Sequence, residues 1–66
     1  MKISINGETK NIPDGSTVAA LLDELGFDPK ATVVERNAEI LERANYADTT
    51  LAEGDALELV RFVGGG

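Results

Sequence analysis

The feature that most constrains the fold is size: 66 residues without a cysteine must be held together by one small hydrophobic core. A chain this short buries only about 60% of the surface that its unfolded form exposes, and no disulfide can compensate. A hydrophobic fraction of 42% and only two prolines argue against intrinsic disorder. We therefore expect a single compact domain with little room for an active-site cleft of its own.

The charge of the chain argues against several classes of partner. Twelve acidic and six basic residues give a formal net charge of −6, which repels nucleic acid and anionic lipid and favours basic protein surfaces. The first five residues alternate polar and apolar types, unlike a secretory signal, and no apolar run approaches the length of a membrane span. We expect a cytoplasmic protein that binds neither nucleic acid nor membranes.

The start of the chain predicts a β-hairpin. Residues 1–5 alternate apolar and polar side chains, which is typical of a strand with one buried face. Asn6-Gly7 readily adopts the positive φ angles of a type I′ turn. Residues 8–12 should therefore return antiparallel to the first strand.

A helix is predicted next, after the turn residues 13–16. Thr17 is suited to cap it and Gly26 to end it, and residues 18, 21, 22 and 25 place aliphatic side chains on one face. In a chain with so little core, this face should lie across the sheet.

A second hairpin is predicted from residue 32 onward. Residues 32–36 begin with β-branched side chains and favour a strand. Asn37-Ala38 stands at the expected tip, and residues 40–41 continue beyond it. Because the Cβ of Ala38 resists positive φ, this turn is either of another type or mildly strained. A short helical turn should follow around Ala44 and Tyr46, and we expect Tyr46 to serve packing rather than recognition.

The last strand is predicted at residues 56–63, after a turn at 53–55. Leu57 and Leu59 should face the core. The opposite side carries Glu58, Val60 and Phe62, and large apolar groups exposed there would form a partner-binding surface. The alternative is that Phe62 folds back onto the domain.

Together these elements predict an α+β domain in which a mixed sheet of four to five strands packs on one main helix. A right-handed crossover can place the last strand beside the first. The expected core comprises Ile3, Ile5, Val18, Leu21, Leu22, Leu25, Leu57 and Leu59.

Neither cysteine nor histidine occurs in the sequence. This removes thiolate and imidazole metal sites, thiol nucleophiles and Ser-His pairs. Sites built from carboxylates alone stay open, but nothing in the sequence supports one. We therefore expect no catalytic residue, no metal and no bound cofactor, and interpret the chain as a carrier rather than an enzyme. If it handles sulfur, the only suitable attachment point is a carboxylate.

The three glycines Gly64, Gly65 and Gly66 directly follow the last predicted strand. Without side chains they can extend by about 10 Å, at roughly 3.3 Å per residue, and thread a narrow channel. We predict a domain at 1–63 and a flexible tail at 64–66, with Gly64 and Gly65 passing into a partner's active site and Gly66 presenting its carboxylate. A carboxylate is a poor electrophile, so a partner enzyme must first adenylate it with ATP. The alternative is an inert, frayed end or a cloning remnant.

Several segments resemble the ThiS family of thiamine-biosynthesis sulfur carriers, and the likeness covers nearly the whole chain. The matching segments are residues 5–8, 13–18, 32–40, 46–47, 51–55 and 57–66. The sequence departs from the family pattern at Ala38, where glycine is frequent, and at Glu42, where proline is frequent. Both positions are far from the tail in sequence, so they bear on turn geometry rather than on chemistry.

The resemblance implies a ubiquitin-like β-grasp fold and a thiocarboxylate on Gly66. It further implies three partners: an E1-like (ThiF-like) adenylating enzyme that uses ATP, a thiazole synthase (ThiG-like) that receives the sulfur, and a sulfur donor such as a cysteine desulfurase system. Three alternatives remain open at this point. They are a small-subunit-like sulfur carrier of molybdopterin synthase, a ubiquitin-like modifier joined through Gly66 to a lysine, and an interaction domain with an inert tail.

Overall fold

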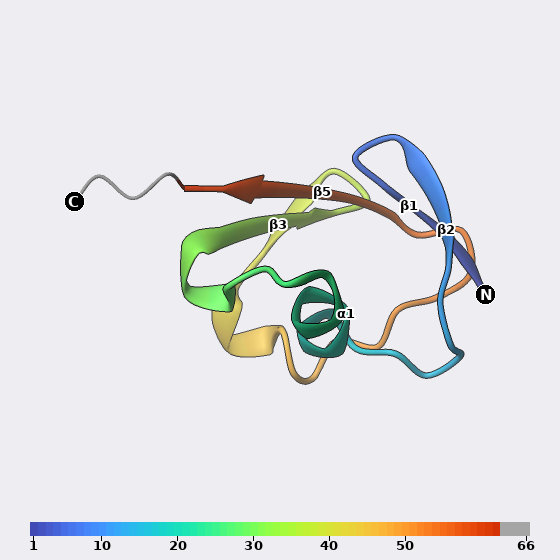
Figure 1. Ribbon diagram of the computed structural model, residues 1–66, viewed down its shortest axis with the longest axis horizontal. Coiled ribbons are helices and arrows are strands. Elements are labelled where there is room, and N and C mark those ends of the chain that lie inside the picture. The colour runs from blue at the N-terminus through green and yellow to red at the C-terminus, as the bar shows by residue number, and fades with distance from the viewer. Residues whose placement is uncertain (63–66) are drawn as a thin grey trace.

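Five strands form one mixed sheet in the order β2-β1-β5-β3-β4, and a single α-helix covers one of its faces (Figure 1). The computed structural model describes residues 1–62. The elements, in chain order, are β1 (Lys2–Ile5), β2 (Glu8–Asn11), α1 (Val18–Leu25), β3 (Thr32–Arg36), β4 (Glu39–Leu41) and β5 (Ala56–Arg61), with short 3-10 helices η1 (Pro29–Ala31) before β3 and η2 (Arg43–Asn45) after β4. This arrangement confirms the predicted α+β class.

Both predicted hairpins are present, and both use turns with positive φ. Asn6 and Gly7 have φ of 51° and 83°, as a type I′ turn requires. Asn37 and Ala38 have φ of 53° and 70°, so of the two outcomes considered for this turn the strained one is found. Asparagine tolerates this conformation, whereas the Cβ of alanine opposes it.

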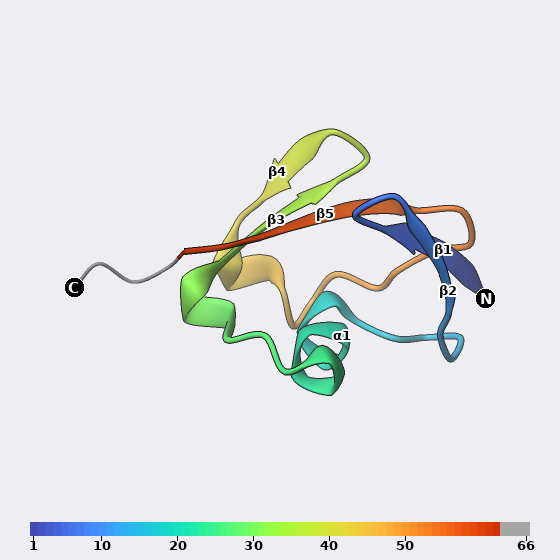
Figure 2. The same cartoon turned by 45° about the horizontal axis from the view of Figure 1, so that its top comes forward.

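The predicted crossover places β5 between the two hairpins. It runs parallel to β1, with Leu57 opposite Ile5, and antiparallel to β3. The Asn6 side chain strengthens this junction, because its amide oxygen accepts from the Leu59 backbone N–H at 2.8 Å. Figure 2 shows both hairpins joined through β5.

Helix α1 begins and ends where the sequence predicts. The Thr17 hydroxyl accepts from the Ala20 backbone N–H at 3.1 Å, and Gly26 ends the helix with φ of 78°. Leu21 and Leu22 are buried against the sheet, but Leu25 is only partly buried, which corrects its assignment to the core. Its place in the last turn leaves it at the periphery of the core.

The remaining predicted core residues are buried as expected. The core also contains four residues that the prediction omitted, namely Ile12, Val34, Tyr46 and Leu51. Tyr46 confirms its predicted packing role, since its ring is 4% exposed and its hydroxyl donates to the Thr32 carbonyl at 2.9 Å. Within residues 1–62 no helix has the length and apolar character needed to cross a membrane.

Candidate functional site

The predicted reactive residue and its approach, Gly66 with Gly64 and Gly65, lie outside the described residues. Val63, the expected end of the last strand, lies outside them as well, and the described strand ends at Arg61. The structure therefore defines the region up to Phe62: the sheet face that β5 displays and the contacts of Arg61 and Phe62.

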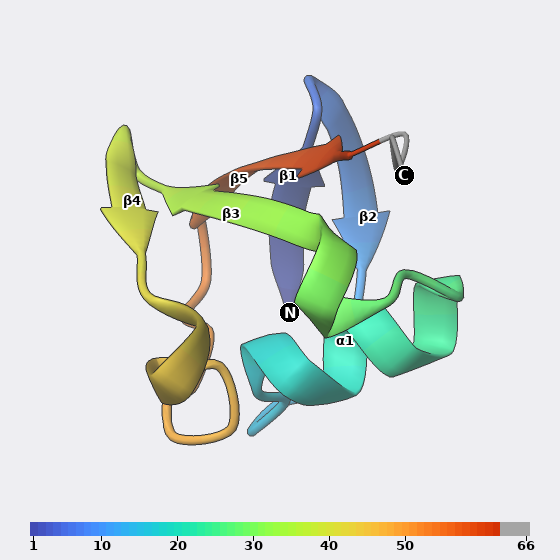
Figure 3. The same ribbon diagram turned by 90° about the vertical axis from the view of Figure 1, so that its left-hand side faces the viewer.

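The three residues predicted to bind partners are all exposed on the sheet face turned away from α1. Val60 is 52% exposed and Phe62 is 60% exposed. Glu58, two residues before Val60, is exposed as well. Phe62 thus does not fold back onto the domain. Leu57 and Leu59 point the other way, into the core, because successive side chains of a strand alternate between faces. Figure 3 shows α1 on one side of the sheet only.

The neighbouring strands enlarge this surface. In the register of β3, Val33 lies opposite Val60, and Glu35 lies opposite both Glu58 and Ile40. Ile40 is 72% exposed and was missed by the sequence analysis. Its place on this face could have been predicted from the two-residue turn at 37–38. That turn pairs residue 36 with 39 and residue 35 with 40, so Ile40 lies beside Glu35. We call Ile40, Val60 and Phe62 the open-face patch.

The last described residues, Arg61 and Phe62, are held by two contacts. The Phe62 backbone N–H donates to the Ala31 carbonyl at 2.8 Å, which adds one bond beyond the β3–β5 ladder. The Arg61 guanidinium carbon lies 4.2 Å from the centroid of the Phe27 ring, within the range of a cation–π contact. The sequence analysis did not anticipate either contact, because each joins residues about thirty positions apart along the chain.

Asp55 is a buried carboxylate that organises the turn before β5. It accepts hydrogen bonds from the Ala52 backbone N–H at 2.8 Å, from the Arg36 guanidinium at 3.0 Å and from the Asn37 amide at 3.1 Å. Burial alone would raise its pKa, but these hydrogen bonds and the Arg36 charge outweigh burial and lower the pKa of Asp55. Since every partner is structural, Asp55 ties the second hairpin to β5 rather than serving chemistry.

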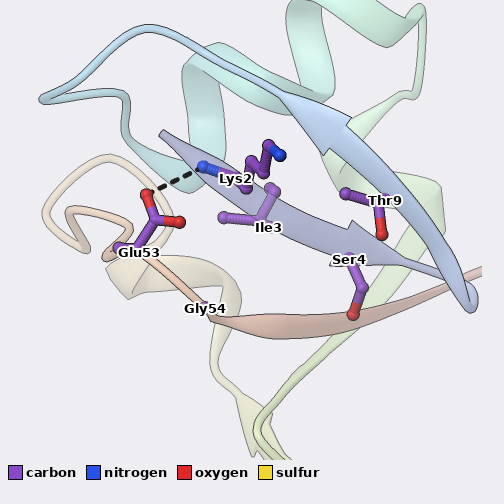
Figure 4. A pocket seen from close by; sticks show the side chains of 6 residues that line it. All are labelled: Lys2, Ile3, Ser4, Thr9, Glu53 and Gly54. Carbon is purple, nitrogen blue, oxygen red and sulfur yellow. Dashed lines mark hydrogen bonds between the residues drawn. The ribbon is translucent and has the colours of Figure 1, made fainter.

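A hollow lies beside β1. It is lined by Lys2, Ile3, Ser4, Thr9, Glu53 and Gly54 (Figure 4). Its volume of about 210 Å³ is below the ~300–1,000 Å³ typical of small-molecule sites. The Glu53 carboxylate accepts from the Lys2 backbone N–H at 2.9 Å and thereby joins the start of β1 to the turn before β5. Residues 1–62 contain no group of acidic side chains arranged to hold a metal ion.

Comparison with known proteins gives consistent results. The chain matches the ThiS family over residues 3–66. It is 37% identical to the sulfur carrier protein ThiS of Bacillus subtilis, over 97% of this chain and 98% of that protein. The crystal structure of the thiamine biosynthesis protein ThiS from Geobacter metallireducens superposes with a TM-score of 0.85, at 35% identity and with complete coverage of both chains.

A second group of relatives is much longer. A thiazole synthase of Paramagnetospirillum magneticum is 50% identical over all 66 residues, and one of Magnetococcus marinus is 46% identical, but the chain spans only 20% of the length of each. The family match and the full-length similarity to a ThiS protein also confirm the β-grasp fold that the resemblance implied. The chain therefore belongs to the ThiS family.

Proposed function

We propose that this chain is a sulfur carrier of thiamine biosynthesis that delivers sulfur for thiazole formation as a thiocarboxylate on Gly66. The observation that carries the proposal is the similarity, over nearly the whole of both chains, to the sulfur carrier protein ThiS of Bacillus subtilis. The geometry is compatible with this role, because β5 ends at Arg61, three residues before Gly64 in the sequence, and displays exposed apolar side chains near its end.

The chemistry has to be supplied by partners, because the chain has no cysteine or histidine to act as a nucleophile or base. In the proposed first step, a Gly66 carboxylate oxygen attacks the α-phosphorus of ATP, and pyrophosphate leaves. In the second step, hydrosulfide attacks the acyl carbon, AMP leaves with the bonding electron pair, and loss of the sulfur-bound proton gives the thiocarboxylate. If the donor presents the sulfur as a persulfide, a thiol has to reduce the resulting acyl disulfide and is itself oxidised to a disulfide. The chemistry requires Gly66 to have a free carboxylate. The protein acts as a co-substrate and the E1-like partner as the enzyme.

The receiver in this proposal is a thiazole synthase. Support comes from the two thiazole synthases that contain a region similar to the whole of this chain. A donor such as a cysteine desulfurase system would supply the sulfur. The open-face patch, together with Glu58, is the proposed docking surface, since exposed apolar side chains beside a reactive segment favour recognition by a larger partner.

The test is mass spectrometry of the 66-residue chain after incubation with an E1-like adenylating enzyme, ATP and sulfide. We expect a mass increase equal to the exchange of one oxygen for one sulfur. The control variant lacks Gly66. Its carboxylate is displaced by about 3.3–3.6 Å, and a misplacement of even 1 Å can cost on the order of 100-fold in rate.

Other outcomes would favour other functions. Sulfur gain at an undiminished rate in the shortened chain would contradict the role of Gly66. A covalent adduct on lysines of other proteins would indicate a modifier. A loaded chain that supplies molybdopterin synthase rather than thiazole synthase would identify the other pathway.

A further inference from the structure

The contact between Arg61 and Phe27 connects the end of β5 to the segment that follows α1. Phe27 follows Gly26, the residue that ends the helix, and its backbone N–H donates to the Leu22 carbonyl at 2.8 Å, so the helix end fixes its backbone. Its ring packs against the core. The Phe27 ring is therefore held in place where it contacts the side chain of Arg61, the last residue of β5.

No acidic side chain among residues 1–62 forms an ion pair with the Arg61 guanidinium. The ion pairs of this part of the chain join the N-terminal amine to Asp14 and Arg36 to Asp55. Arg61 points to the α1 side of the sheet, opposite to Val60 and Phe62, because side chains alternate along the strand. It consequently stands outside the open-face patch, on the other side of the sheet.

The stack and the Phe62 hydrogen bond act on adjacent residues. Arg61 is held through its side chain by Phe27, and Phe62 through its backbone by Ala31. Both supporting residues belong to the segment between α1 and β3. Losing the stack would leave the end of β5 held by its backbone pairing with β3 and by the Phe62 hydrogen bond alone.

We propose that Arg61, stacked on Phe27, is a positioning residue that holds the end of β5 in place for reaction at Gly66, five residues further along the chain. This inference rests on the proposed function. It separates two tasks: the open-face patch binds the partner, and the Arg61–Phe27 stack aligns the tail once the partner is bound. Alignment contributes to rate by holding the reacting group in a productive geometry.

The experiment compares sulfur loading by the wild type with that by Arg61→Ala, Phe27→Leu and the double variant, using an E1-like enzyme, ATP and sulfide. Phe27→Leu keeps an apolar body on the core and removes the aromatic face. Lys10→Ala, on the far edge strand, controls for the loss of one positive charge. Assays run at a temperature at which circular dichroism shows every variant folded.

We expect kcat to fall by about two- to fivefold in each single variant, the factor that an exposed cation–π contact represents, while KM stays unchanged. The double variant should be no slower than the slower single variant, because both remove the same contact. A purely stabilising contact would leave kcat unchanged under these conditions. Lys10→Ala should load at the wild-type rate.

Two results would overturn the proposal. One is an unchanged kcat in Arg61→Ala. The other is a loss in Arg61→Ala that Phe27→Leu does not reproduce, which would mean that the guanidinium contacts the partner directly. A wild type that gains no sulfur would instead contradict the proposed function. In that case the rate of hydrogen exchange at the Phe62 amide still tests whether the stack holds residue 62. This rate should increase in Arg61→Ala and stay unchanged in Lys10→Ala.

Discussion

Ala38 occupies a conformation that alanine disfavours. Its φ is 70°, and a Cβ in this region costs about 1 kcal/mol. We expect Ala38→Gly to leave the free energy of unfolding unchanged or to raise it by up to about 1 kcal/mol, because relief of strain competes with the greater freedom of glycine in the unfolded chain. Urea denaturation measures this. Ala20→Gly, on the exposed side of α1, is the control and should lose about 1 kcal/mol; an equal loss in Ala38→Gly would contradict the strain.

Asp55 should make stability depend on pH in the acid range. Its pKa is lower in the folded chain than the ordinary value of 3.8, so its contribution is complete above that value and is lost as pH falls through the folded pKa. Asp55→Asn should cost about 1–3 kcal/mol at pH 7, the range for a buried partner left incompletely satisfied. Urea denaturation between pH 7 and pH 2 measures both chains. The difference in the free energy of unfolding between the wild type and Asp55→Asn should shrink toward pH 2. A difference that stays constant over this range would contradict the proposed charge effect.

At the scale of elements, the contribution of each leucine in α1 and β5 to the free energy of unfolding should follow how deeply its side chain is buried. Leu22 is completely buried and Leu57 is 1% exposed, so truncating either to alanine should cost about 2–5 kcal/mol. The free energy of unfolding of a domain of this size is only about 3–10 kcal/mol in total. Leu25→Ala is the matched control, because the same atoms are removed from a partly buried site. Thermal unfolding should rank Leu25→Ala as the mildest, and equal losses would mean that the helix face is wrongly assigned.

The elements were predictable where their signals are local. Asn6-Gly7 fixes its turn by its own φ preference, and Thr17 and Gly26 delimit α1 through bonds within one helical turn. Exposure of Val60 and Phe62 followed from alternation along one strand. The Asp55 network and the Arg61–Phe27 stack were not predicted, because they depend on contacts between segments that only the tertiary fold brings together. The tail chemistry stays a prediction.

At the scale of the whole molecule, the hydrophobic core and the proposed docking surface lie on opposite sides of the same sheet. One side packs on α1 and holds the core, and the other displays the open-face patch beside acidic Glu35 and Glu58. Substitutions in the open-face patch can therefore change binding with little effect on the fold. A net charge of −6 should also accelerate approach to a basic partner surface.

Phe62→Ser tests this separation of roles. The side chain is 60% exposed, so its loss should change the free energy of unfolding by no more than about 0.5 kcal/mol. An aromatic anchor at an interface contributes about 2 kcal/mol or more, which corresponds to a roughly 30-fold weaker affinity for the E1-like enzyme. Isothermal calorimetry gives the affinity and circular dichroism the stability. Ala20→Ser, on the helix side of the molecule, is the control and should bind like the wild type. Unchanged affinity in Phe62→Ser would remove Phe62 from the interface, whereas equal losses in both variants would show that binding responds to the domain as a whole rather than to one face of its sheet.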